Sequence, residues 1–369
     1  MSVGKTEGPG PELPVQGVSV PEIRVDQLTG QRVVLAPGRA ERPDAFVREP
    51  AETRTSPEDC PFCEGHEDST PPEVYAVRPG GGEPDSPGWT VRVVPNLYPV
   101  VADADDDETP AATTGAADSG FASAADPLRA PTRAGEPDLF AASPARGAHE
   151  VIVSAPEHVP SLAELTPERF AGAVEAWRER IRAHAEASYC HLIVNEGPDA
   201  GASLEHTHAQ LYALDFVPTA VARERERFAA YHERTAGGHL LENVAAEEVR
   251  RGERLVAIDD DALLVAPWAS RSPFELRVIP RRPAPSFEHD GEVGTAMIRT
   301  ALEALAEVLG SPRLNLWVRT APRGAEDFNW HVDIVPRLTV RAGFEMGTGV
   351  EINIYPPERA ADDLRRVIS

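Results

Sequence analysis

The chain has 369 residues, of which 41% are hydrophobic and 26% charged, a composition typical of globular enzymes. At about 150 residues per domain, this length predicts more than one domain or one duplicated unit. The 36 basic residues are outnumbered by 60 acidic ones, which gives a net charge of −24. Nucleic acids and anionic membranes bind basic surfaces, so the charge argues against both as partners.

Neither a membrane segment nor an export signal is expected. No apolar run approaches the roughly 20 residues of a transmembrane helix, and residues 1–17 lack the apolar stretch of a signal peptide. Three cysteines are too few for a disulfide framework. We therefore expect a cytoplasmic protein, in which a close cysteine pair indicates a metal or redox site.

The N-terminal part of the chain contains two predicted strands and two segments without a predicted fold. Residues 1–20 are rich in Pro and Gly and are expected to form a flexible tail. Strands are predicted at 32–36 and 90–95. Residues 102–146 are rich in Ala, Asp and Pro, with few large apolar groups to offset the entropy of ordering. We expect this segment to be a mobile acidic insertion.

A strand, a helix and two strands follow. The strands are predicted at 150–155, 191–195 and 209–214, and the helix at 166–186. Thr166 is a good N-cap residue. An apolar stripe at helical spacing follows it and indicates a face packed on the core: Phe170, Val174, Trp177 and Ile181.

The C-terminal part repeats this order of elements. A helix is predicted at 294–310, among strands predicted at 254–258, 262–266, 275–280, 314–320 and 331–336. Strand, strand, helix, strand, loop and strand thus recur, which signals a duplicated unit. We predict an α+β fold with two equivalent halves, 21–215 and 216–369, which share a mainly antiparallel sheet flanked by helices.

The densest group of chemically active residues is His206-Thr-His208-Ala-Gln210. The spacing of two predicts that these three polar side chains share one face of a strand. Gly197 and Gly201 precede them in a loop whose backbone amides can approach phosphate oxygens. A neutral imidazole attacks phosphorus without prior deprotonation. The alternative is a pair of surface histidines on an edge strand, which the surrounding Asn, Ser, Gly and Gln residues disfavour.

A second motif is the pair Cys60 and Cys63, spaced as in a zinc knuckle. Such a site needs two further ligands. A redox role is the alternative, and it is less favoured because no helix start follows the first cysteine.

The His-Thr-His-Ala-Gln run resembles the histidine-triad superfamily. The order of motifs over residues 22–357 resembles the galactose-1-phosphate uridylyltransferase family, a nucleotidyltransferase branch with a duplicated histidine-triad fold. The matching segments are 27–43, 60–74, 92–101, 149–158, 273–280 and 343–353.

This resemblance implies roles for individual residues. His208 would be the nucleophile that forms a covalent nucleotidyl-histidine, and Gln210 would support the phosphoryl group. The other implied substrate contacts are Asn195 and Ser203 with the nucleotide phosphates, Asn96 near the base, Arg39 and Arg42 with ribose or phosphate, and Glu345 with sugar hydroxyls. Guanidinium–phosphate pairing suits the two arginines, although solvated loop arginines are the alternative.

The resemblance also implies the metal ligands. His158 and His206 would join Cys60 and Cys63 in one closed, structural Zn²⁺ site per chain, with His149 and His66 as rival ligands. A second metal is not favoured, because Asp333 replaces one histidine of a His-x-His in the second half.

The implied reaction is transfer of UMP from UDP-glucose to galactose 1-phosphate by a ping-pong route in a homodimer. The partners would be a nucleotide sugar and a hexose 1-phosphate, with no ATP, NAD or catalytic Mg²⁺. One alternative is an ADP-glucose phosphorylase-like enzyme that uses phosphate as acceptor, which the ending GFEMGTGVEIN also resembles. Another is a nucleotide-binding protein without turnover.

Overall fold

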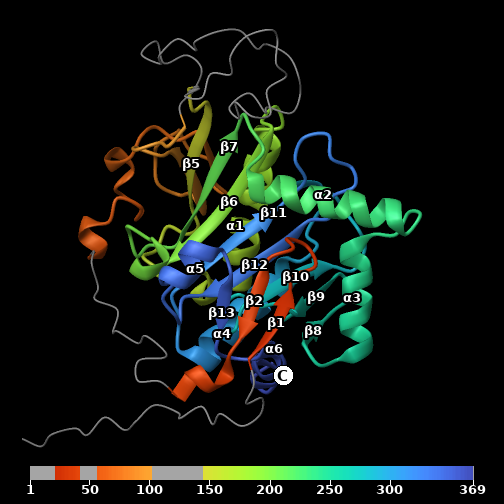
Figure 1. The fold of residues 1–369 in the computed structure, drawn as a ribbon. Helices are drawn as coiled ribbons and strands as arrows, with labels where there is room; N and C mark the ends of the chain where they lie inside the picture. Colours follow the sequence, from red (N-terminus) through yellow and green to blue (C-terminus); the bar gives the residue numbers. More distant parts are fainter. Residues whose placement is uncertain (1–20, 42–55, 102–143, 369) are drawn as a thin grey trace, which may run out of the picture.

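The computed structural model describes residues 21–41, 56–101 and 144–368. Ten strands in this part form one large sheet, in the order β3-β4-β5-β7-β6-β11-β12-β10-β9-β8 (Figure 1). The strands of one half are β3 (Tyr75–Val77), β4 (Val91–Pro95), β5 (Gly147–Val153), β6 (Tyr189–Glu196) and β7 (His208–Leu214). Those of the other are β8 (Leu255–Ile258), β9 (Ala262–Val265), β10 (Leu276–Pro280), β11 (Leu314–Arg319) and β12 (His331–Pro336).

The two halves of the sheet have matching strand orders. Reading inward from each edge gives 3-4-5-7-6 on one side and 8-9-10-12-11 on the other. Helix α1 (Pro167–Ala183) follows β5, and helix α4 (Thr295–Leu309) follows β10 at the matching place. All pairs in this sheet are antiparallel, and β6 pairs with β11 to join the halves. The predicted boundary after residue 215 falls between β7 and the next helix.

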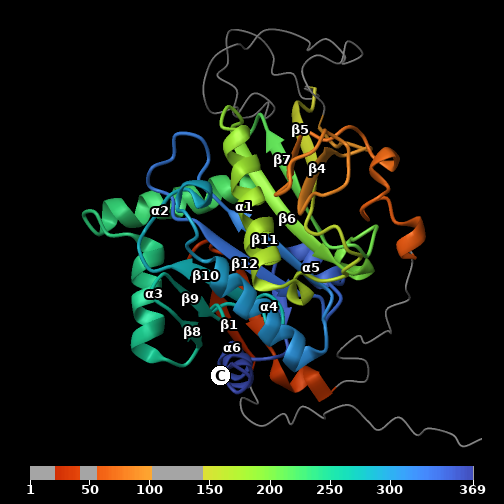
Figure 2. The same ribbon diagram turned by 180° about the vertical axis from the view of Figure 1, so that it is seen from behind.

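Helices α1 and α4 cover one face of the sheet (Figure 2). The alternation within β11 shows why: Leu314, Leu316 and Val318 are 2%, 0% and 0% exposed and pack into the main core with both helices. The residues between them, such as Asn315 and Trp317, face the opposite side and are only partly buried. The helices therefore pack on the face of the sheet that carries the apolar side chains, and the polar side chains lie on the opposite face.

The polar face is partly covered by smaller elements. A three-stranded sheet of β1 (Glu22–Val25), β2 (Arg32–Leu35) and β13 (Glu351–Asn353) lies over the second half, beside α5 (Gly343–Thr348) (Figure 1). The helices α2 (Thr219–Arg234) and α3 (Leu240–Arg251) pack at the side with a second apolar cluster. Helix α6 (Pro357–Arg365) ends the described chain.

The predicted α+β class, with a mainly antiparallel sheet and flanking helices, is confirmed. The ten predicted strands all form, with ends that shift by up to three residues, and Thr166 caps α1 through its side chain. The expected tail (1–20) and almost all of the expected insertion (102–143) lie outside the described residues. Among the described residues, no helix is long and apolar enough to cross a membrane.

Candidate functional site

Four predicted metal ligands come together in the first half. The ligand atoms of Cys60, Cys63, His158 and His206 all lie within 4.8 Å of one another. Nδ1 of His206 lies 3.6 Å from both sulfur atoms, and Nδ1 of His158 lies 3.5 Å from Sγ of Cys63. These contacts join the 60–63 loop, the loop after β5 and the start of β7.

The chemistry of these donors fits a divalent metal ion. Nε2 of His206 lies 2.8 Å from the carbonyl of Ala155, which can only accept, so the proton sits on Nε2 and Nδ1 is free to ligate. Burial lowers the pKa of His206 to about 4, which keeps it neutral. Burial and the neighbouring Cys60 raise the pKa of Cys63 to about 12, and a bound cation would reverse that shift. Two thiolates with two imidazoles form a typical closed zinc set.

Neither rival ligand belongs to this cluster. Nδ1 of His66 lies 2.7 Å from the Cys60 carbonyl, and His149 lies on β5 beside Gln210. In one detail the sequence interpretation was wrong: β7 begins at His208, so His206 precedes the strand. The N–H of Thr207 donates to the Val159 carbonyl at 2.7 Å, which ties this segment to the loop after β5.

His208 is the first residue of β7 and is 4% exposed. Its Nδ1 lies 2.8 Å from the His206 carbonyl, so Nδ1 carries the proton and Nε2 keeps a lone pair. The ring of Phe62 packs edge-on against it, with centroids 5.2 Å apart. Burial lowers the pKa of His208, which favours the neutral imidazole.

Gln210 belongs to a cluster of polar side chains that come from β5, β7 and the residue after β4. Its Oε1 lies 3.0 Å from Nε2 of His149 and accepts from the Tyr212 hydroxyl at 2.9 Å. Nδ2 of Asn96 lies 3.1 Å from the same His149 nitrogen, and the rings of His149 and Tyr212 stack at 4.1 Å. His149, a rival metal ligand in the sequence, thus lies beside the predicted phosphoryl-binding amide.

Asn195 lies near the end of β6, opposite Asn315 of β11. Nδ2 of Asn315 donates to Oδ1 of Asn195 at 2.8 Å and to the Ala200 carbonyl at 2.7 Å. The loop that follows Asn195 contains Gly197 and Gly201, both with positive φ, and leads to the exposed Ser203. Sequence reasoning missed Asn315, because only the register of two distant strands brings it to the site.

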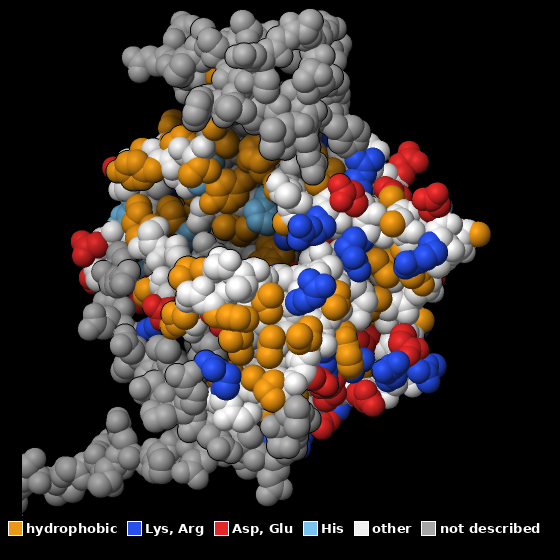
Figure 3. All heavy atoms as spheres, viewed as in Figure 1, with side chains coloured by type: hydrophobic (Ala, Val, Ile, Leu, Met, Phe, Trp, Pro, Cys, Tyr) orange, Lys and Arg blue, Asp and Glu red, His pale blue; other side chains and the backbone are white. Residues whose placement is uncertain are grey.

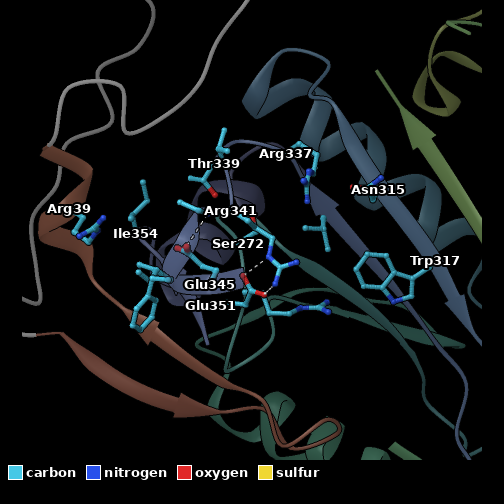
Figure 4. Close-up of a pocket in the computed structure, with 16 residues that line it drawn as sticks. Arg39, Ser272, Asn315, Trp317, Arg337, Thr339, Arg341, Glu345, Glu351 and Ile354 are labelled. Carbon is cyan, nitrogen blue, oxygen red and sulfur yellow. Dashed lines mark hydrogen bonds and ion pairs between the residues drawn. The ribbon is translucent and has the colours of Figure 1, made fainter. Parts of the chain in front are cut away.

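A pocket of about 470 Å³ lies on the same face in the second half (Figure 4). Arg39 and Glu345, both predicted from the sequence, line it together with Asn315, Trp317 and Arg337. Arg39 approaches from the side opposite β11 and β12. In the space-filling view, a hollow crosses the middle of this face, with a histidine side chain at its edge and arginines along one side (Figure 3). Arg42 lies outside the described residues.

Positive charge dominates the pocket lining. Four arginines line it, against two glutamates: Arg39, Arg271, Arg337 and Arg341, with Glu345 and Glu351. Arg341 pairs with Glu351 at 2.6 Å, and Arg271 pairs with Glu275 outside the lining. Within the described chain, the guanidinium groups of Arg39 and Arg337 have no ion-pair partner. The pocket lining is therefore locally cationic in a protein of net charge −24.

In the second half, Asp333 takes the position where the first half has its second histidine. Nε of Arg277 donates to it at 2.7 Å, and Arg271 lies 3.4 Å away. These cations hold the pKa of Asp333 well below its usual range. The neighbouring His331 is fully buried, and burial lowers its pKa to about 3. Ion pairs thus occupy this position.

Comparison with known proteins agrees with this geometry. A family model described as "Galactose-1-phosphate uridyl transferase, N-terminal domain" matches residues 94–218. An ADP-glucose phosphorylase of Arabidopsis thaliana is 30% identical over 365 residues, which cover 94% of this chain and 93% of that protein. The chain belongs to the galactose-1-phosphate uridylyltransferase family. Membership of this family identifies it as a nucleotidyltransferase.

The likeness extends over almost the whole chain in another relative and in a solved structure. A galactose-1-phosphate uridylyltransferase of Cryptococcus neoformans is 27% identical and covers 93% of this chain and 89% of its own. The crystal structure of an ADP-glucose phosphorylase from Arabidopsis thaliana with bound ADP-glucose has a TM-score of 0.72 at 27% identity. It covers 94% of this chain and 99% of that one. The fold predicted from the family resemblance is thereby confirmed.

Proposed function

We propose that the protein transfers a nucleotidyl group from a nucleotide sugar to a phosphate-bearing acceptor, through a covalent intermediate on His208. The observation that carries the proposal is the fixed tautomer of this buried imidazole, whose Nδ1–H donates to the His206 carbonyl at 2.8 Å. Nε2 then has a lone pair at neutral pH, and a neutral imidazole nitrogen is a competent nucleophile toward phosphorus.

In the first half-reaction, Nε2 attacks the α-phosphorus in line, and the bond from this phosphorus to the bridging oxygen breaks. The sugar 1-phosphate leaves with the electron pair of that bond. Nδ1 keeps its proton, so the nucleotidyl-imidazole is positively charged and remains bonded to the His206 carbonyl. In the second half-reaction, a phosphate oxygen of the acceptor attacks the same phosphorus and Nε2 leaves.

The neighbouring polar groups supply donors for the phosphoryl oxygens. Asn195 lies near the end of β6, which pairs with the nucleophile's strand β7, and Ser203 follows in the next loop; Gln210 lies two residues after His208 on β7. Donors fixed before reaction stabilise charge that grows on these oxygens in the transition state. Asn96, whose side chain lies beside His149, is proposed to border the nucleotide.

We assign zinc to the cluster of two cysteines and two histidines, as one structural ion per chain. The four ligand positions leave no open coordination site, so the ion would tie the 60–63 loop to the segment that carries His208. Every step at phosphorus is performed by protein groups.

The pocket beside Arg39, Arg337 and Glu345 is proposed to hold the acceptor and the leaving sugar phosphate. Guanidinium groups suit a phosphate dianion, and a carboxylate suits sugar hydroxyls. The first candidate reaction is UMP transfer from UDP-glucose to galactose 1-phosphate. The second is ADP-glucose phosphorolysis, with phosphate as acceptor; the full-length likeness to an ADP-glucose phosphorylase supports it.

Intact mass spectrometry tests the proposal. The protein is incubated with UDP-glucose or with ADP-glucose, and the mass increment distinguishes a bound UMP from a bound AMP. Galactose 1-phosphate or inorganic phosphate is then added, and the acceptor that discharges the adduct identifies the reaction. His208→Gly is expected to form no adduct while it keeps its fold and metal. An adduct that persists in this variant would place the nucleophile elsewhere.

We further propose a cytoplasmic homodimer. The dimer is supported by two groups of exposed apolar residues, one after β4 and one around α5.

A further inference from the structure

We propose that Asn315 is a positioning residue that fixes the orientation of the Asn195 amide, so that Asn195 presents N–H donors, and not its oxygen, to the substrate phosphates. The inference rests on the proposed function, in which Asn195 contacts the phosphates. It adds a residue of the second half to the nucleotide site in the first half.

The orientation of Asn315 follows from an unambiguous partner. One end of its amide lies 2.7 Å from the Ala200 carbonyl, which can only accept a hydrogen bond. That end must therefore be the Nδ2 donor. The same atom lies 2.8 Å from the Asn195 side chain, so the Asn195 atom that faces it must be the acceptor, Oδ1.

The orientation of Asn195 follows in turn. With Oδ1 engaged by Asn315, its Nδ2 is turned the other way, alongside Gly201: a Cβ added to that glycine would lie 3.7 Å from it. Among the described residues, this Nδ2 has no hydrogen-bond partner. Two N–H donors next to the strand of His208 suit the oxygens of a phosphate, whereas an oxygen there would repel them.

The placement of Asn315 makes this role specific. It lies on β11, which pairs with β6 at the junction of the two halves, and it also lines the acceptor pocket. Its two bonds join Asn195 to the loop residue Ala200, so one amide orders both the side chain and the loop.

Asn315→Asp tests the inference, because it replaces the donor by a carboxylate of almost the same size. The carboxylate would face two oxygens, and Asn195 would rotate to satisfy it and turn Oδ1 toward the phosphates. We expect the single-turnover rate of adduct formation to fall roughly 10- to 100-fold. Asn315→Ala, which removes more volume but adds no repulsion, should be less impaired than Asn315→Asp. If alanine were the worse variant, Asn315 would act by packing.

A double-mutant cycle tests whether the effect passes through Asn195. In an Asn195→Ala background, adding Asn315→Asp is expected to slow adduct formation by no more than about twofold further. Fully multiplicative effects would overturn the inference. The control is Asn243→Asp in α3, where the side chain bonds Tyr231 away from the site; it should behave as wild type.

The affinity for ADP-glucose and UDP-glucose is measured by calorimetry with the same variants. If wild type forms no adduct, the proposed chemistry fails. The double-mutant cycle is then evaluated on the binding affinities, and it still decides whether Asn315 and Asn195 act together. Equal affinities in wild type and Asn315→Asp would overturn the inference in that case.

Discussion

Cys63 is the best single position at which to test the metal cluster, because its sulfur contacts both ligating histidines. Cys63→Ser replaces a soft thiolate by a hydroxyl and leaves three ligands. We expect the zinc content to fall from one per chain to a small fraction and the melting temperature to drop, because ligand binding and folding are linked. Elemental analysis and a thermal melt measure both.

Cys190→Ser is the matched control. Cys190 is buried in β6 and is not part of the cluster of four ligands, so its thiol contributes nothing to the metal site. This variant should keep its zinc. Unchanged zinc in Cys63→Ser would reject the assigned ligand set.

The raised pKa of the Glu196 carboxyl leads to a prediction of how stability depends on pH near neutrality. It is 6% exposed, and burial raises its pKa from 4.5 to about 7 against the opposing effect of donors from Leu162 and Ser161. Because the folded-state pKa is above the unfolded one, its contribution to stability is complete below about pH 4.5 and is lost as the pH rises through about 7. Glu196→Gln removes this titration.

The free energy of unfolding of Glu196→Gln, relative to wild type, should therefore rise between pH 5 and 8. The shift of the Glu196 pKa limits this rise in the free-energy difference to about 3 kcal/mol. Urea denaturation at several pH values measures it. A flat difference would mean that this carboxylate stays ionised when buried.

At the scale of elements, Gly147 shows how closely β5 approaches β7. Its φ is +143°, and a Cβ there would lie 1.9 Å from the Ala213 carbonyl oxygen. Gly147→Ala should therefore lower the free energy of unfolding by more than about 2 kcal/mol. Gly172→Ala in α1, where nothing lies within 4 Å, should instead raise it by about 0.5–1 kcal/mol. Chemical denaturation compares the two, and equal effects would contradict the close approach.

The elements differ in how far the sequence could predict them. Nine of the ten strands of the large sheet, and β2 of the small sheet, were predicted because each has apolar residues that pack on one or both faces. The helices α2 and α3 were missed because charged runs such as Arg223-Glu-Arg-Glu-Arg hide their narrow apolar stripe. The short strands β1, β3 and β13 contain only three or four residues each, too few for a clear alternation.

The residues of the candidate site also differ in how far the sequence could predict them. The motif residues His208, Gln210, Cys60 and Cys63 could be named from local spacing and family resemblance. Asn315 could not, because its role depends on β6 and β11 pairing in one register across 120 residues of chain. Local patterns predict ligands and nucleophiles, whereas the residues that orient them become visible only with the tertiary fold.

At the scale of the whole molecule, two groups of large apolar side chains are exposed, one after β4 and one around α5. One follows β4 and consists of Leu97, Tyr98 and Val100, which are 62%, 82% and 63% exposed. The other lies around α5 and consists of Val340, Phe344 and Met346, which are 72%, 50% and 69% exposed. Large apolar side chains grouped on a surface mark an interaction site. In a two-fold dimer, each group of one subunit can cover the other group of its partner.

This arrangement predicts a site shared between subunits. The first apolar group follows Asn96, which reaches Gln210 through His149 and so borders the nucleophile. The second group surrounds Glu345, so pairing the two groups would bring Glu345 to the His208 site of the partner. The competing arrangement is a site within one chain, because Glu345 lines the same pocket as Asn315, which bonds Asn195.

Complementation distinguishes the two arrangements. His208→Gly and Glu345→Ala are each expected to be inactive in the full reaction. After subunit exchange, confirmed by native mass spectrometry, a mixed dimer with a shared site contains one intact pocket, so up to about half of its sites should recover activity. If both residues served the same chain's pocket, every site would carry one defect and no activity would return. Glu345→Ala alone should still form the nucleotidyl adduct while it uses the hexose phosphate poorly. Loss of both half-reactions to the same degree would assign Glu345 a structural role in α5, where its carboxylate accepts from the Ala342 N–H at 3.0 Å.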